Sequence, residues 1–250
     1  MSRLDSFFEN NYISESIEDR GIMKACFMAG NAGAGKSYVI TKIKSGQIEP
    51  RIVNVDVWIE YYTKQLKSAG ITGSIYDTPH HDKSKKLTVN QLYLYINSML
   101  PLWIDSTSTD PLGVVKRYSI LESLGYDIAM VFVQTSLETS LERAANRNER
   151  VVPPDKVKEY YEKAMEVKDF LKGRFPLFMV VNNDTGELTD EVVTKAFKKM
   201  LFFFDSPLQN PVGKRTIDLM KDNKWKYLTP DVYSDSELKG IVNSWYRSTS

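Results

Sequence analysis

The chain has 250 residues, and its 33 basic and 32 acidic side chains leave a formal net charge of +1. This length supports one sizeable α/β domain, and the near-neutral balance gives no general attraction to nucleic acid, although it is compatible with a local basic groove. The single cysteine, Cys26, lies in an apolar run, which excludes a disulfide framework and favours a buried residue in a reducing, cytoplasmic setting.

No window approaches the roughly 20 apolar residues of a membrane span, and residues 1–5 carry no apolar stretch of the signal-peptide type, so we expect neither membrane insertion nor secretion. Short apolar runs flanked by turn or capping residues predict five buried strands, at 25–29, 52–55, 102–104, 129–133 and 178–181. Helical stretches alternate with them, at 36–44, 111–124 and 137–148. This alternation predicts right-handed βαβ units and a parallel sheet covered on both faces.

Local signals mark several element boundaries. Asp110 before Pro111 predicts an N-cap followed by a first-turn proline, and Gly125 lies where the same helix should end. Residues 135–138, which read TSLE, have the spacing of a capping box. The interval 60–97 is less regular, and we expect a substrate-contacting insertion there.

A phosphate-binding pattern follows the first predicted strand. Residues 30–37 read GNAGAGKS and match G-x-x-x-x-G-K-[ST] between a strand and a helix. The glycines permit positive φ, so that backbone N–H groups and the helix N-terminus surround a β-phosphate, while Lys36 reaches the β- and γ-phosphates and Ser37 binds Mg²⁺. No N-K-x-D sequence for guanine is present, so we expect ATP. The residues expected to bind it are Gly30, Asn31, Ala32, Gly33, Ala34, Gly35, Lys36 and Ser37.

Two aspartates follow predicted strands and are candidate site residues. Asp56 ends the second predicted strand, and a carboxylate at the carboxyl edge of a parallel sheet could accept the proton of an attacking hydroxyl. Asp105 follows an apolar run in the manner of a Walker B acid, which would hold the Mg²⁺ shell through water. The alternative for Asp56 is a helix N-cap or a loop carboxylate in water, and the alternative for Asp105 is a helix N-cap.

Three arginines lie along one face of the fourth-strand helix and just beyond it. Arg143, Arg147 and Arg150 are spaced i, i+4 and i+7. They could stack on adenine and neutralise the transferring phosphoryl group, which makes them candidate catalytic residues. The alternative is a solvated helix face whose arginines pair with the neighbouring acids Glu138, Glu142 and Glu149.

At these residues the chain resembles the P-loop kinases grouped with zeta toxins, polynucleotide 5′-kinases and chloramphenicol phosphotransferase. The resemblance covers about residues 24–181 and rests on the loop 30–37, Asp56, the strand 101–105 and the arginine-rich segment 141–154. It implies a general base at Asp56, a mobile lid that carries the three arginines, and a loop at Asn182 and Asn183 beside the adenine. Residues 57–60 lack the arginine that polynucleotide kinases place after the strand-end aspartate, so the acceptor stays open.

The sequence therefore predicts a three-layer α/β P-loop NTPase fold whose five parallel strands have the order 2-3-1-4-5. We expect a kinase domain over residues 1–204, with an insertion at about 60–97 and a lid at about 143–160, and a C-terminal appendage over 205–250. The expected function is ATP- and Mg²⁺-dependent phosphoryl transfer to a hydroxyl of a nucleotide, nucleotide sugar or related small molecule. The alternatives are a polynucleotide or modified-base kinase and a hydrolytic or non-catalytic nucleotide switch.

Overall fold

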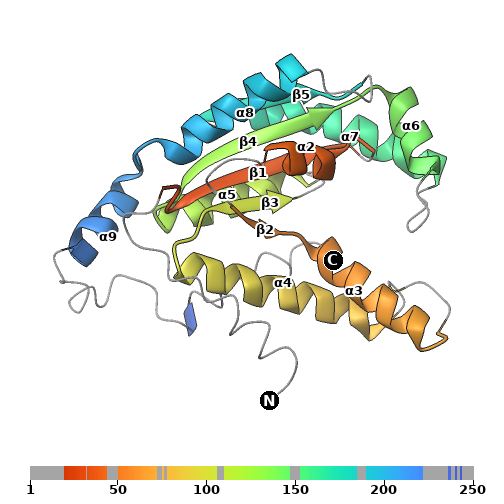
Figure 1. Ribbon diagram of the computed structural model, residues 1–250, viewed down its shortest axis with the longest axis horizontal. Coiled ribbons are helices and arrows are strands. Elements are labelled where there is room, and N and C mark those ends of the chain that lie inside the picture. The colour runs from red at the N-terminus through yellow and green to blue at the C-terminus, as the bar shows by residue number, and fades with distance from the viewer. Residues whose placement is uncertain are drawn as a thin grey trace.

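A parallel sheet of five strands lies at the centre of the computed structural model (Figure 1). Its order is β2-β3-β1-β4-β5, as predicted from the sequence. The strands are β1 (Lys24–Gly30), β2 (Arg51–Val53), β3 (Leu102–Asp105), β4 (Asp127–Gln134) and β5 (Leu177–Asn182). The structure describes residues 20–31, 33–43, 50–71, 75, 78–105, 110–146, 153–184, 190–221, 236, 237, 240 and 243.

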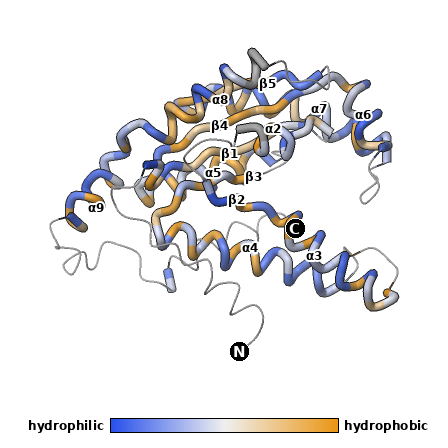
Figure 2. Tube along the Cα trace, in the orientation of Figure 1, coloured by the Kyte–Doolittle hydropathy of each residue, from blue (hydrophilic) through white to orange (hydrophobic). Residues whose placement is uncertain are grey.

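Helices cover both faces of the sheet, which gives the three layers expected. They are α2 (Lys36–Ile43), α3 (Val55–Ser68), α4 (Pro79–Asn97), α5 (Pro111–Ser123), α6 (Leu137–Ala145), α7 (Pro154–Lys172), α8 (Asp190–Asp205) and α9 (Pro211–Lys221). On one face Phe27 of β1 packs in a cluster with residues of α4, α5 and α7, and on the other Met28 packs with residues of α2 and α8. Figure 2 shows the apolar strands enclosed between these helices.

Strand β1 is buried along its whole length, because both of its faces are covered. Cys26 lies in it, fully buried, and burial raises the pKa of its thiol well above the usual range. The thiol therefore stays protonated and serves as a core residue, as the sequence indicated. No helix in the described part of the chain is both long and apolar enough to cross a membrane.

The interval 60–97 differs from the expectation of an irregular insertion. Its described residues lie mostly in α3 and α4, which pack against each other beside β2 (Figure 1). The second predicted strand is also shorter than expected, because it ends at Val53 and Asn54 begins α3 as its N-cap. Asp56 is thus a first-turn helix residue rather than the last residue of a strand.

Two of the predicted helix boundaries are confirmed, and one moves by a residue. Asp110 caps α5 by accepting a hydrogen bond from the Gly113 amide at 3.0 Å, and Gly125 follows that helix with a φ of 96°. The N-cap of α6 is Ser136, whose hydroxyl accepts from the Thr139 amide at 3.2 Å. Thr135 of the capping-box pattern therefore lies one position before the cap.

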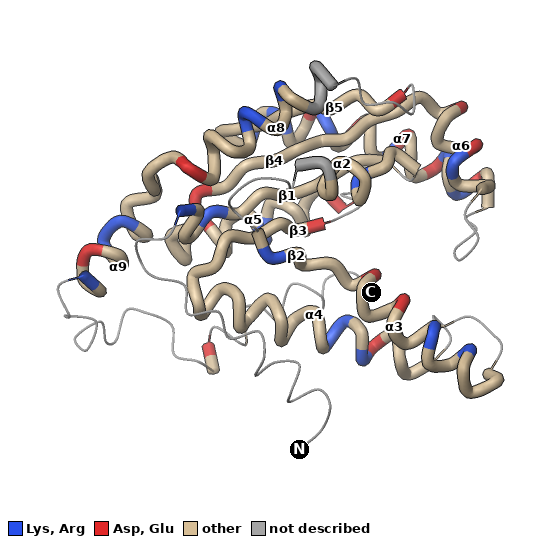
Figure 3. Tube along the Cα trace, viewed as in Figure 1, with Lys and Arg blue, Asp and Glu red and all other residues tan. Residues whose placement is uncertain are grey.

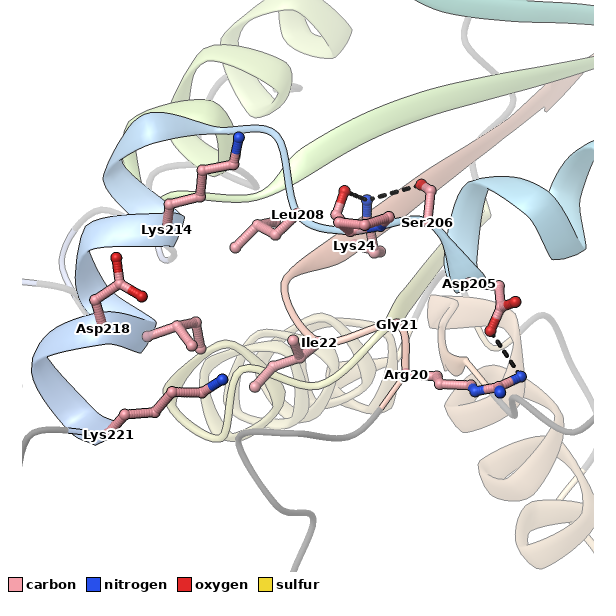
Figure 4. Close-up of a pocket in the computed structure, with 12 residues that line it drawn as sticks. Arg20, Gly21, Ile22, Lys24, Asp205, Ser206, Leu208, Lys214, Asp218 and Lys221 are labelled. Atoms are coloured by element: carbon pink, nitrogen blue, oxygen red, sulfur yellow. Dashed lines mark hydrogen bonds and ion pairs between the residues drawn. The ribbon is translucent and has the colours of Figure 1, made fainter.

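The segment after α8 is tied to the amino end of the sheet. The Lys24 ammonium donates to Asp127 at 2.6 Å, to the Ser206 hydroxyl at 3.3 Å and to the Pro207 carbonyl at 3.2 Å. A cavity of about 370 Å³ lies beside Lys24, between residues 20–22, this segment and α9. Figure 4 shows the side chains that line it. Residues 206–221 thus lie against the main domain, while the domain boundary at 204/205 stays a prediction.

Candidate active site

The phosphate-loop pattern forms a tight turn between β1 and α2. Gly30 and Gly33 have φ values of 145° and 78°, in the region that favours glycine. A Cβ on Gly30 would lie 2.1 Å from the Val133 carbonyl oxygen, and one on Gly33 would lie 2.8 Å from that of Ser140. The backbone of the loop therefore lies directly against β4 and α6, in a position that only glycine allows. Ala32 lies outside the described residues.

The loop offers donors to a polyphosphate. Among the described residues, no backbone or side-chain oxygen accepts a hydrogen bond from the amides of Gly33, Gly35 and Ser37. Lys36 donates from its ammonium to the carbonyls of Gly30 at 3.2 Å and Asn31 at 3.3 Å, and so lies across the loop. These amides, the start of α2 and the ammonium fit a bound triphosphate.

Buried side chains hold the loop in place from behind. The side-chain amide of Asn31 donates to the hydroxyl of Ser140, which is fully buried in α6. The side-chain amide of Asn183, which follows β5, donates to the Ala34 carbonyl at 2.7 Å. The structure thus places Asn183 against the phosphate loop, and its expected position beside the adenine stays a prediction. Ser140 was not recognised from the sequence, because nothing local marks its partner 109 residues away.

Arg143 joins the same two regions. Its guanidinium donates to the Gly33 carbonyl at 3.3 Å and to the Asn183 carbonyl at 2.9 Å. It therefore bridges α6, the phosphate loop and the end of β5, and it is half-buried rather than part of a solvated helix face. Arg147 and Arg150 lie outside the described residues, so their predicted roles stay predictions.

Asp184 fixes the start of α6 and is a second residue that the sequence did not reveal. Its Oδ1 accepts from the Ser136 amide at 2.8 Å and from the hydroxyls of Thr135 at 3.2 Å and Thr139 at 3.1 Å. Hydrogen bonds from Ser136, more than those from the threonines, lower the pKa of the Asp184 carboxyl to about 2. The carboxylate thus stays ionised and ties the end of β5 to α6.

The two candidate carboxylates lie at the same edge of the sheet as the loop. Asp105 ends β3 and pairs in register with Met28, two residues before the loop begins. Asn54 links it to Asp56, because the Asn54 amide group donates to Asp105 Oδ2 at 2.9 Å and accepts from the Asp56 N–H at 2.8 Å. Figure 3 shows acidic residues at the end of β3 and the start of α3.

The predicted magnesium ligands are Ser37 and Asp105. Ser37 is exposed in the first turn of α2, and Asp105 is half-buried at the end of β3. Hydroxyl and carboxylate oxygens suit Mg²⁺, which keeps several waters and binds substrate phosphates. The described residues contain no group of three His, Cys, Asp or Glu side chains that could hold a metal ion.

Comparisons with known proteins give one family match and several similar solved structures. The family model for zeta toxin matches residues 11–185, which is more than half of the chain. A search of curated protein sequences found no match to the chain. Three similar solved structures are the tunicamycin resistance protein of Deinococcus radiodurans, deoxyadenosine kinase from M. mycoides with bound dCTP, and a gluconokinase from Sinorhizobium meliloti 1021.

These three structures are distant from the chain. Sequence identities are 16%, 17% and 16%, and TM-scores are 0.44, 0.40 and 0.42, in that order. The alignments cover 74%, 70% and 73% of this chain and 98% of each of the other chains.

Proposed function

Because the chain belongs to the zeta toxin family of P-loop kinases, we propose that it transfers the γ-phosphoryl group of ATP to a hydroxyl of a nucleotide, nucleotide sugar or related small molecule. The observation that carries this proposal is the shared position of three features. The phosphate loop, the Asp105 carboxylate and the first turn of α3 with Asp56 all lie at the carboxyl edge of the sheet. Ligands bind at this edge in open α/β sheets.

The chain would bind the triphosphate through the phosphate loop. The amides of Gly33, Gly35 and Ser37 would donate to phosphate oxygens, and the Lys36 ammonium would move from the loop carbonyls to the β- and γ-phosphates. Ser37 and Asp105 would hold Mg²⁺, which when bound neutralises phosphate charge. ATP and Mg²⁺ are therefore the proposed cosubstrate and metal.

The acceptor hydroxyl would be activated from α3. Asp56 would accept its proton as the oxygen attacks the γ-phosphorus in line with the bond to the leaving oxygen of ADP. Arg143 would keep the loop and the nucleotide side of the site in fixed relation, and Arg147 and Arg150 would add positive charge at the transferring group. Closure of the segment at about 143–160 would exclude water, which otherwise takes the phosphoryl group.

The acceptor class can be identified with ATP labelled at the γ-phosphate. The labelled ATP, with Mg²⁺, is incubated at low and high salt with nucleosides, nucleotides, nucleotide sugars, DNA and RNA ends, and modified DNA. We expect label in a nucleotide or nucleotide sugar, with weak salt dependence, and its loss in Lys36→Ala. Lys172→Ala, which removes an exposed lysine at the end of α7, is the matched control.

The other outcomes identify the alternatives. Label in nucleic acid that falls steeply with salt would replace the small acceptor by a polynucleotide or a modified base, because phosphate contacts release counterions. Label that appears only as inorganic phosphate, whatever acceptor is added, would contradict kinase activity and favour a nucleotide-dependent switch.

A further inference from the structure

One amide side chain connects the two carboxylates of the proposed site. Asn54 follows β2, and because Val53 pairs with Ile104, Asn54 comes level with Asp105 at the end of β3. Its Nδ2 donates to Asp105 Oδ2 at 2.9 Å, while its Oδ1 accepts from the Asp56 backbone N–H at 2.8 Å. The two ends of the amide therefore have different partners, one on each side.

Capping alone does not require asparagine at this position. Asn, Asp and Ser are about equally good N-caps, since each supplies an oxygen to an amide of the first turn. Aspartate here would set a second carboxylate against Asp105, and like charges at such a distance repel. Serine could cap and donate its O–H at once, but its donor and acceptor are then a single atom on a shorter side chain. Asparagine places its accepting oxygen and its N–H on separate atoms, one towards the Asp56 N–H and one towards Asp105.

We propose that Asn54 is a positioning residue, which holds the first turn of α3, and with it Asp56, in fixed relation to Asp105. The inference rests on the proposed function, in which Asp56 accepts the proton and Asp105 supports the metal. Without the link, α3 would keep its cap while its first turn could shift relative to β3. A displacement of about 1 Å in a reacting geometry can cost on the order of 100-fold in rate.

Asn54→Ser tests this role, because serine keeps an oxygen for the cap and removes the separate N–H group that reaches Asp105. We expect transfer to the acceptor to fall by about 10- to 100-fold, with KM for ATP changed less than about 3-fold. ATP hydrolysis without acceptor should fall much less, so the ratio of transfer to hydrolysis drops. A loss of folded enzyme would lower both rates equally and leave this ratio unchanged. Thr78→Ala, which removes the N-cap of α4, is the control and should keep the wild-type ratio.

A stability cycle tests the link itself without any activity. Asn54→Asp should lower Tm by placing two carboxylates together. Combining Asn54→Asp with Asp105→Asn should recover most of that loss, because the amide and the carboxylate then exchange places and the new amide at position 105 can donate to the new carboxylate at position 54.

Recovery in the double variant, together with the lower ratio in Asn54→Ser, supports the proposal. A wild-type ratio in Asn54→Ser, or no recovery in the double variant, overturns it. Wild-type protein that transfers no phosphate to any acceptor contradicts the proposed function instead, and the stability cycle still decides whether Asn54 forms the link.

Discussion

Two carbonyls of the phosphate loop accept hydrogen bonds from the Lys36 ammonium, and a bound triphosphate would take their place. We predict that Lys36→Ala lowers kcat/KM by about 10²- to 10³-fold, the usual effect of losing one donor to a transition-state oxyanion. Tm without nucleotide should change little, because Lys36 is only half-buried. Steady-state kinetics of the variant and of Lys172→Ala measure the effect. Equal kcat/KM values for the two variants would contradict the role of Lys36.

The Asp184 carboxylate gives a prediction about pH. Its folded pKa is about 2, against an ordinary value of 3.8, so its contribution to stability is complete above pH 3.8 and is lost as pH falls towards 2. Asp184→Asn keeps the accepting oxygen and removes the charge. Its Tm should lie below that of the wild type at neutral pH, and the difference should narrow below about pH 4. Thermal melts from pH 7 to pH 3 measure this.

Asp169→Asn, which removes an exposed carboxylate from α7, is the control for that series. Its Tm should follow the wild type across the pH range. A constant difference between Asp184→Asn and the wild type down to pH 3 would show that the charge of Asp184 does not stabilise α6.

Residues of the site differ in how well the sequence predicts them. The phosphate loop could be recognised because its glycines, lysine and serine are contiguous. Asn54 and Asp184 could not, because their partners lie 51 and 48 residues away, at the end of β3 and just after β4. Strand ends that are distant in sequence meet at one edge of the sheet, and only the three-dimensional register shows which polar side chains face each other.

At the scale of elements, Arg143 couples α6 to the phosphate loop. Two separate nitrogens of the Arg143 guanidinium donate to the Gly33 and Asn183 carbonyls, whereas lysine would have to serve both from a single nitrogen without the planar fork. We predict that Arg143→Lys weakens ATP binding by about tenfold, which corresponds to roughly 1.4 kcal/mol, because the loop is less firmly held. Calorimetric titration with ATP measures it. Arg174→Lys, at an exposed arginine whose guanidinium donates to the Phe170 carbonyl, is the matched control. Unchanged affinity in Arg143→Lys would contradict the coupling.

The packing of α9 gives a second prediction at this scale. A Cβ on Gly213 would lie 2.2 Å from the Gly125 carbonyl oxygen, so Gly213→Ala must displace α9 from the turn between α5 and β4. We expect a loss of about 1–3 kcal/mol in the free energy of unfolding, as for overpacking in a core. Helix propensity alone would raise the free energy of unfolding, since alanine is favoured over glycine in a helix by about 1 kcal/mol.

Urea unfolding of Gly213→Ala and Gly173→Ala separates the two effects. No atom lies within 4 Å of a Cβ on Gly173, so that change should be neutral or slightly stabilising. Equal or higher stability of Gly213→Ala would mean that α9 does not pack on the domain as described.

Helix α4 shows why part of the fold could not be predicted. Its buried positions include Ser84 and Thr88, which are polar, so the apolar period of a helix is interrupted. Their hydroxyls donate to the carbonyls four residues earlier, of His80 at 2.8 Å and of Ser84 at 2.9 Å. These bonds satisfy polar groups inside the helix pair. The strands were predictable because they are continuous apolar runs.

For the whole molecule, the strand order explains the position of the site. Because β1 lies between β3 and β4, the phosphate loop after β1 has Asp105 of β3 on one side. On its other side the loop contacts β4 through Gly30 and α6 through Gly33. This order was predictable from alternating strands and helices together with the resemblance to P-loop kinases. The acceptor was not predictable, because no contiguous motif of the sequence specifies it and one fold serves many substrates.

The central claim is that Asp56 directs the γ-phosphoryl group to an acceptor hydroxyl. The most direct test measures how label from γ-labelled ATP divides between the acceptor and inorganic phosphate in the wild type, in Asp56→Asn and in the control Asp169→Asn. We predict that Asp56→Asn loses label in the acceptor by at least about 100-fold, in the upper range of general-base effects, while ATP binding persists. Asp169→Asn should behave as the wild type. The contrary result is that the wild type places label only in inorganic phosphate and that Asp56→Asn forms labelled phosphate at the same rate. Asp56 would then not activate an acceptor hydroxyl.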